Sequence, residues 1–295
     1  MIVSDFIGEI AASIAALLWA VSSVIYSRLG LKIAPLQLNL YKGIIAIAFI
    51  VITLSIQGQT FRDTSSLTIA LLALSGVVGI GLGDTAYFAA LNSLGARRTL
   101  LLETSSPPMG ALLAFIFIGE QLSPSSWCGI LLTILGIAWV ISERNPVANI
   151  EVSRQGIIWG ISAAISQAVG SVISRFALLQ SDISPLQSTL IRLLGGTVIV
   201  LIFLLLNAKQ TQIEWQLSKR SLVIIAIAAF GSTYLGIWLQ QTSLKFAPTG
   251  IAQTFLATSP LFILPIVALQ GEKISLRAIL GVLVSLGGIA VMFVR

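Results

Sequence analysis

The chain has 295 residues, of which 56% are hydrophobic and only 9% are charged, and its formal net charge is +6. A soluble globular protein carries about 25% charged residues, so this composition excludes a soluble protein and predicts an integral membrane protein. The absence of histidine and the single cysteine exclude internal disulfides, Cys/His zinc sites and a histidine base. We expect no metal site and no cofactor.

Apolar runs separated by polar residues, glycine or proline predict about ten membrane-spanning helices. No Lys or Arg precedes the first run, so we interpret it as an uncleaved first helix rather than a signal peptide. The connections are short, which predicts a bundle of antiparallel neighbours. The predicted cores of the spans are residues 10–26, 38–55, 67–91, 99–118, 127–141, 157–178, 189–206, 222–244, 250–269 and 276–294.

One signature occurs twice. Each copy has a Ser-Pro pair and then a Gly-Glu pair. In both copies the Glu of that pair is followed after nine residues by a Gly, and after seven more by a second Gly. Glycines a heptad apart lie close to one helix face and allow another backbone to approach. We interpret both glutamates as structural caps that favour the N-terminus of the following helix. The copies are Ser106-Pro107, Gly119-Glu120, Gly129 and Gly136, and then Ser259-Pro260, Gly271-Glu272, Gly281 and Gly288.

The two halves of the chain match at further positions. Lys42 stands seven residues after Pro35, as Arg192 stands seven residues after Pro185, and Gly83 corresponds to Gly236. We predict two five-helix repeats, residues 1–142 and 153–295, joined by a polar linker at 143–152. An odd number of spans inverts the second repeat, and inverted repeats are the architecture of many secondary transporters.

These residues resemble the EamA-like members of the drug/metabolite transporter superfamily. The prolines before the second helix of each half, Lys42 and Arg192 within it, and the duplicated Ser-Pro, Gly-Glu and Gly signature carry the resemblance. It implies ten helices and a transporter, not an enzyme, in the cell (inner) membrane. Such a protein moves a small organic metabolite by alternating access, with export of an amino acid or similar solute as the family-based expectation. The family usually has Arg at the position of Lys42, so this chain departs from it there.

Two indications of orientation disagree. The loops after the odd-numbered spans carry more Lys and Arg than the side with the termini, and the positive-inside rule would place the termini outside. The resemblance implies cytoplasmic termini.

Polar and aromatic side chains at helical spacing predict the wall of a central cavity that binds the substrate. The alternative is that small and hydroxyl residues only pack helices together, and that Trp238 belongs to an interfacial belt. The glycines of the third span, Gly79, Gly81 and Gly83, predict close packing or bending. The predicted cavity residues are Trp19, Ser23, Tyr26, Gln167, Ser171, Tyr234, Trp238 and Gln241.

Four ionisable residues, Lys42, Asp84, Glu103 and Arg192, fall within predicted spans, where charge is costly and function is the default interpretation. Lys42, Asp84 and Glu103 lie at similar depths, and two carboxylates with one ammonium would leave a surplus negative charge that offers a proton site. Asp84 or Glu103 would then carry a coupling proton, with Lys42 as its modulator. The alternatives are an ion-pair cluster that locks helices, and Lys42 and Arg192 side chains that extend to the interface.

Three other functions remain open. The first is exchange of phosphorylated sugars, with Lys42 and Arg192 facing the phosphate. The others are a non-transporting membrane subunit and an intramembrane enzyme, for which no nucleophile or zinc motif is found. The expected partners are a small-molecule substrate and lipid. No basic stripe indicates nucleic acid, and no Walker A motif indicates ATP.

Overall fold

The computed structural model describes residues 6–30, 32–61, 64–141, 153–206, 217–262, 265 and 275–292, which form helices joined by short connections without a strand. Two of the segments, η2 (Val77–Gly83) and η3 (Phe230–Leu235), are π-helical. In chain order the elements are α1 (Ile7–Leu29), α2 (Pro35–Gln57), α3 (Ser66–Gly76), η2 (Val77–Gly83), α4 (Asp84–Glu103), α5 (Ser106–Ile118), α6 (Pro124–Ile141), α7 (Arg154–Leu179), α8 (Pro185–Leu206), α9 (Lys219–Ala229), η3 (Phe230–Leu235), α10 (Gly236–Phe246), α11 (Thr249–Leu256) and α13 (Leu276–Met292).

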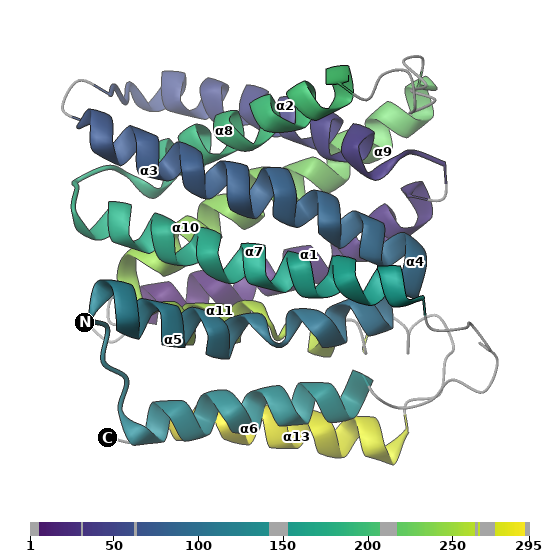
Figure 1. Cartoon of the computed structure of the whole chain (residues 1–295), viewed down its shortest axis with the longest axis vertical. Helices are drawn as coiled ribbons and strands as arrows, with labels where there is room; N and C mark the ends of the chain where they lie inside the picture. Colours follow the sequence, from purple (N-terminus) through teal and green to yellow (C-terminus); the bar gives the residue numbers. More distant parts are fainter. Residues whose placement is uncertain are drawn as a thin grey trace.

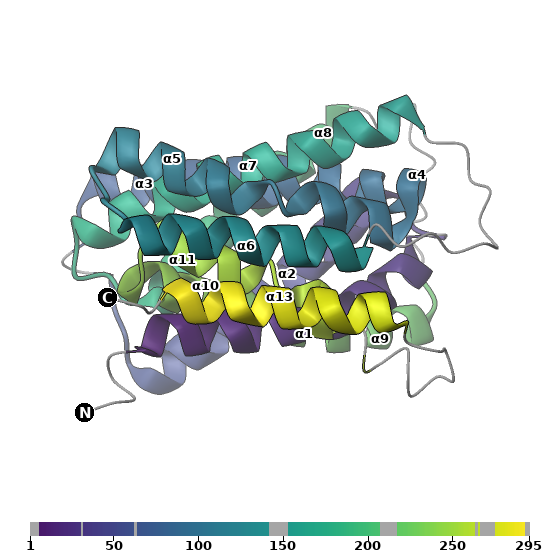
Figure 2. The ribbon, with the colours of Figure 1, turned by 90° about the horizontal axis from the view of Figure 1, so that it is seen from below.

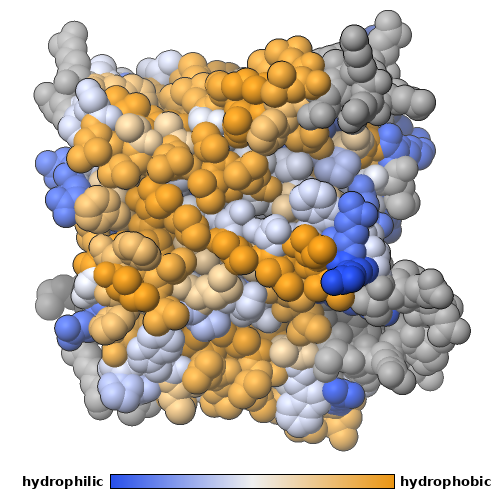
Figure 3. Space-filling view, in the orientation of Figure 1, coloured by the Kyte–Doolittle hydropathy of each residue, from blue (hydrophilic) through white to orange (hydrophobic). Residues whose placement is uncertain are grey.

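The all-helical membrane fold class is confirmed. Within the described residues, seven helical stretches are long and apolar enough to cross a membrane, and Pro124–Trp139 and Ile279–Met292 are shorter apolar helices. Hydrophobic residues cover most of the visible face, and hydrophilic residues gather at the two ends of the helices (Figure 3). The predicted ninth span begins with α11 and continues into residues outside the described ones. The seven long stretches are Ile7–Leu29, Pro35–Gln57, Ser66–Gly95, Arg98–Ile118, Arg154–Leu179, Pro185–Leu206 and Lys219–Phe246.

Local sequence signals explain where these helices begin and end. Ser65, Ser153 and Ser218 each cap a helix N-terminus by accepting a hydrogen bond from a backbone N–H, as capping serines do. Gly95, with φ 76°, breaks α4 into two helical pieces. Gly119, with φ 75°, ends α5, because glycine adopts this left-handed conformation without a steric penalty.

The two halves of the chain interlock in the bundle. α1 packs against α10 and α11, α2 against α8, and α4 against α7. The glycine-rich η2 crosses α7 closely, since a Cβ on Gly170 would lie only 3.0 Å from the Cα of Gly79. The prediction that the glycines of this span allow close packing is therefore confirmed. α1 begins and α13 ends on the same side of the bundle (Figures 1 and 2); we call this the terminal side.

α6 and α13 form an antiparallel pair at the edge of the bundle (Figures 1 and 2). They meet at the glycines of the duplicated signature, where a Cβ on Gly288 would lie 2.5 Å from the backbone N of Thr133. Ser285 Oγ also donates to the Thr133 carbonyl oxygen at 3.2 Å. The predicted backbone approach at these glycines is confirmed. The inverted duplication itself, with its boundaries and linker, stays a prediction.

Adjacent glycines on α13 provide a matched test of this packing. Gly288→Ala is expected to lower the free energy of unfolding by about 1–3 kcal/mol, because its Cβ overlaps backbone and the helices must separate. A Cβ on Gly287 meets nothing within 4 Å, so Gly287→Ala is expected to be neutral or to stabilise by up to about 1 kcal/mol through helix propensity. Thermal unfolding of the purified protein in detergent measures both. Equal melting temperatures for the two variants would contradict the packing.

Candidate functional site

A central cavity of about 160 Å³ lies between the two halves of the chain. Its lining comes from α1, α2, η2, α4, α5, α7, α8, η3, α10 and α11. An engineered cavity of about 150 Å³ holds benzene, so this space suits a small solute. Apolar side chains supply most of the wall, and a few polar groups are set into it, as in most small-molecule sites.

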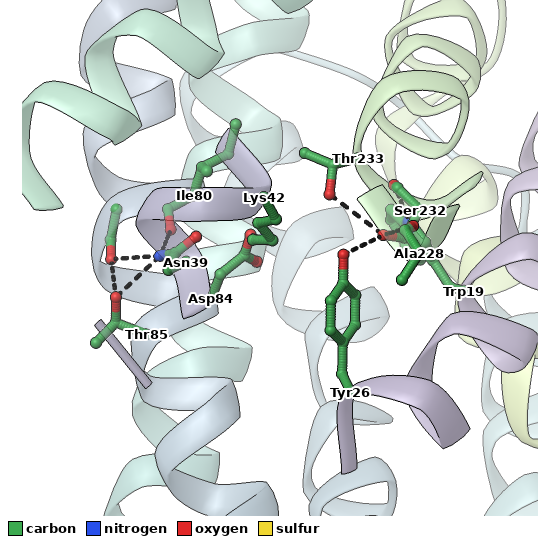
Figure 4. A network of polar contacts seen from close by, with 11 residues as sticks. Trp19, Tyr26, Asn39, Lys42, Ile80, Asp84, Thr85, Ala228, Ser232 and Thr233 are labelled. Atoms are coloured by element: carbon green, nitrogen blue, oxygen red, sulfur yellow. Dashed lines mark hydrogen bonds and ion pairs between the residues drawn. The ribbon is translucent and has the colours of Figure 1, made fainter. Parts of the chain in front are cut away.

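One wall is held together by hydrogen bonds between α1 and the π-helical segment η3 (Figure 4). Trp19 Nε1 donates to the Ser232 carbonyl oxygen at 2.9 Å, and the hydroxyls of Tyr26 and Ser232 lie 3.1 Å apart. Ser232 Oγ also contacts Thr233 Oγ1 at 3.2 Å. Trp19, Ser23 and Tyr26 all line the cavity, so the structure brings these predicted residues together.

The face of α10 that lines the cavity differs from the predicted one. Gln240, rather than Gln241, reaches the cavity. A shift of one residue turns a helix by about 100°, and the π-helical turn of η3 directly precedes α10 and changes the register expected from a regular α-helix. Sequence periodicity alone does not reveal such a turn. The cavity face consists of Ser232, Thr233, Ile237 and Gln240, whereas the prediction named Tyr234, Trp238 and Gln241.

The predicted residues outside the cavity wall have other contacts. Gln241 Oε1 accepts from the hydroxyls of Ser174, at 2.5 Å, and Ser188, at 2.8 Å. Tyr234 contacts Thr53 Oγ1 at 2.8 Å through its hydroxyl, and its ring lies 6.0 Å from that of Trp238. These contacts tie α10 to α7 and α8, and η3 to α2.

On α7, Gln167 lines the cavity, whereas Ser171, one turn later, lies outside its wall and is fully buried. The wall continues from Gln167 to Ala163, one turn earlier.

Lys42 and Asp84 form an ion pair at the cavity (Figure 4). The Lys42 ammonium also lies 5.1 Å from the ring centroid of Phe88, a cation–π contact. Asn39, one turn before Lys42, donates from Nδ2 to the Ile80 carbonyl oxygen at 2.9 Å. This hydrogen bond ties α2 to the π-helical segment η2. Asn39 is not among the residues predicted from the sequence, although an amide one turn from a charged residue in a membrane helix was an available signal.

Glu103 also lines the cavity, but it forms no ion pair with the described residues. Its Oε1 atom is enclosed and has no hydrogen-bond partner. Of the three charged groups expected in one layer, the structure therefore pairs Lys42 with Asp84 and leaves Glu103 separate.

Arg192 is 1% exposed and lines the cavity. Its Nη1 donates to Gln240 Oε1 at 3.4 Å, and its Nε has no partner.

A second ion pair, between Arg175 and Glu120, lies on the terminal side of the bundle. Arg175 Nε donates to Glu120 Oε1 at 2.6 Å, and Arg175 Nη1 donates to the carbonyl oxygens of Leu244 and Lys245 at 2.7 and 2.8 Å. Glu120 Oε2 accepts from the backbone N–H of Thr249 at 2.8 Å. Glu120 therefore caps α11, rather than the following helix α6 as predicted, because the chain packs that distant N-terminus beside the α5–α6 turn. Glu272 lies outside the described residues.

Comparisons with known proteins agree with this architecture. The model of the EamA-like transporter family matches residues 6–142 and 154–294. A crystal structure superposes with a TM-score of 0.78 over 97% of this chain and 96% of that one, at 16% sequence identity, which shows a shared fold.

Curated relatives match at low identity. Protein LicB of Haemophilus influenzae is 24% identical over 232 residues, 76% of each chain. An uncharacterized protein of Pseudomonas aeruginosa, PA1977, is 32% identical over 111 residues, 37% of this chain and 38% of its own length. Mouse solute carrier family 35 member F6 is 28% identical over 127 residues, 41% of this chain and 34% of its own length.

Proposed function

Because this chain belongs to the EamA-like transporter family, we propose that it moves a small organic metabolite across the cell (inner) membrane by alternating access through the central cavity. The observation that carries the proposal is the cavity itself. It lies between two interlocking halves, is about 160 Å³ in volume and combines aromatic, amide and charged side chains. We propose export as the direction, with an amino acid or a similar metabolite as the solute.

The charges around the cavity favour such a solute over a phosphorylated sugar. Lys42 is neutralised by Asp84, which leaves Arg192 as the cation of the lining without a carboxylate partner among the described residues. Glu103 adds an acidic group to the same lining. A phosphate monoester carries nearly two negative charges at neutral pH, so this balance fits a solute with one negative and one positive group better.

We also propose that Glu103 exchanges a proton during transport. The Glu103 side chain is half-buried, and its Oε1 atom is enclosed without a partner among the described residues. An enclosed carboxylate oxygen without a cation is costly in a low-dielectric place, and taking up a proton removes that cost. Lys42 holds Asp84 in an ion pair, so Glu103 is the better candidate of the two acids for a coupling proton.

Filling the cavity is expected to stop transport. Ser23 lines the cavity, and among the described residues its hydroxyl bonds only to the Ala20 carbonyl oxygen of its own helix. Ser23→Phe is therefore expected to reduce counterflow of labelled amino acids in reconstituted vesicles by about tenfold or more. A loss of about 1.4 kcal/mol in binding free energy already weakens affinity tenfold. Val21, on the exposed face of α1, provides the control, and Val21→Phe is expected to remain within about twofold of wild type.

Equal loss in the two variants would contradict a role for the cavity. Wild-type vesicles that move no solute of any class would favour a non-transporting subunit instead.

A further inference from the structure

Arg192 is a buried guanidinium that forms no ion pair with a described carboxylate, and the charge of Asp84, in the same cavity lining, acts on it only from a longer distance. The ion pairs formed by Lys42 and by Arg175 do not include it. Its one hydrogen bond to another described residue is long, 3.4 Å from Nη1 to Gln240 Oε1, and within the described part of the chain its Nε has no partner. A buried charge without a partner is strongly destabilising. An unpaired cation at a cavity wall can therefore bind an anion that enters the cavity from outside the chain.

Two buried amides add further donors to the same cavity. Gln240 and Gln253 line it and are 2% and 3% exposed. The Oε1 of Gln240 accepts from Arg192, and the Oε1 of Gln253 accepts from Ser106 Oγ at 2.7 Å. The Nε2 of each amide has no partner. Both amides thus use their oxygens within the protein and leave their N–H groups without an acceptor.

These three residues lie at similar depths below the terminal side of the bundle. Arg192 is seven residues after the start of α8, Gln240 is six before the end of α10, and Gln253 is four after the start of α11. At 1.5 Å per residue these positions are roughly 10, 9 and 6 Å along their helices. We call Arg192, Gln240 and Gln253 the donor pole of the cavity.

The first half of the chain neutralises its corresponding cation internally. Lys42, seven residues after Pro35, pairs with Asp84, whereas Ile237 stands at the matching position near Arg192 and lines the cavity. The chain therefore supplies an acid for Lys42 and an aliphatic side chain for Arg192. That difference leaves the donor pole with a net positive charge and several unused N–H groups.

We propose that the donor pole binds the carboxylate of the transported solute, which makes the substrate class an amino acid or a similar zwitterion. The inference rests on the proposed function. A guanidinium binds a carboxylate through two parallel hydrogen bonds, and a single negative charge matches the single unpaired cation. The solute's ammonium group then faces the rest of the cavity, whose lining contains Asp84, paired with Lys42, and Glu103, which forms no ion pair with the described residues.

Thermal unfolding of the purified full-length protein tests the anchor, because a bound solute stabilises the folded state. The probes are the L-amino acids added singly, the amide of each that raises the melting temperature, and glucose 6-phosphate. The acids are expected to stabilise the protein, and the matched amides and the sugar phosphate are not. Arg192→Met is expected to weaken binding of the active acids by about 30-fold or more.

The melting temperature without solute separates binding from a structural role. Removal of an unpaired buried charge is expected to leave the Arg192→Met protein at least as stable as wild type. Gln240→Leu is likewise expected to lose solute affinity and keep stability. The neighbouring Gln241, which accepts two hydrogen bonds outside the cavity, is the matched control, and Gln241→Leu is expected to lose stability and keep affinity.

The inference is overturned if Arg192→Met melts lower than wild type and binds the acids as well as wild type does. It is also overturned if amides or the sugar phosphate stabilise the protein as well as the acids do. Transport of a solute without a carboxylate, at equal rates in wild type and Arg192→Met vesicles, overturns the carboxylate anchor and leaves the proposed function standing. Vesicles that move no solute contradict both.

Discussion

Arg175→Met is expected to lower the free energy of unfolding by about 3–5 kcal/mol, because it removes one partner of a buried ion pair. The side chains of Arg175 and Glu120 are only 11% and 12% exposed. The substitution leaves the Glu120 carboxylate without its cation and leaves the carbonyl oxygens of Leu244 and Lys245 without their donor. Chemical or thermal unfolding in detergent measures the loss.

The same contact is expected to hold the terminal side of the cavity closed. It joins the α5–α6 turn, α7 and the α10–α11 connection, and all three must move apart for a solute to pass there. Arg175→Met is therefore also expected to change the rate of exchange across vesicles, since loosening one closed state shifts the balance between the two.

Arg28, an exposed arginine in the last turn of α1, provides the matched control. Arg28→Met is expected to change stability by less than about 0.5 kcal/mol. In a double-mutant cycle with Glu120→Gln, the two losses at the ion pair should not add, because each variant removes the same interaction. Additive losses, or equal melting temperatures for Arg175→Met and Arg28→Met, would contradict the closure.

Glu103→Gln is expected to abolish the response of transport to a pH gradient and to leave solute exchange intact. The glutamine keeps the shape of the side chain but cannot take up and release a proton. A gradient of one pH unit coupled to one proton supports about a tenfold accumulation of solute, so wild-type and variant vesicles should differ by that factor. Accumulation with and without the gradient is the measurement.

Glu9, in the first turn of α1 and outside the cavity lining, is the control, and Glu9→Gln is expected to retain the full gradient response. For the other acid, Asp84→Asn is expected to lower the free energy of unfolding by about 2–3 kcal/mol, because it leaves Lys42 unpaired. This loss is at the low end for a buried ion pair because the Asp84 side chain is 28% exposed. Full gradient-driven accumulation by the Glu103→Gln variant would contradict the proposal that Glu103 carries the coupling proton.

Composition and spacing by themselves determined the fold class and several of its contacts. A chain with 9% charged residues must place most of its surface in lipid, and Pro35 and Pro185 begin helices because proline fits the first turn. The glycines a heptad apart predicted that another backbone approaches closely, because a missing side chain leaves room for a backbone whichever helix packs there. In the structure these glycines lie where α6 packs on α13. Trp19 and Tyr26 were predicted to line the cavity, and both do. Lys42, Asp84, Glu103 and Arg192 were predicted only to be functional candidates, because charge is costly in membrane helices, and the structure places them in the same lining.

Only the tertiary structure decided which partner each of these groups meets. The π-helical turn of η3 precedes the α10 face on which Gln240, rather than Gln241, lines the cavity, and a regular helical period cannot foresee that shift. Lys42 pairs with Asp84 and not with Glu103, although all three lie at similar depths along their helices. Depth follows from counting residues along one helix, whereas pairing depends on how two helices rotate and cross, and that is set by contacts between residues far apart in the chain.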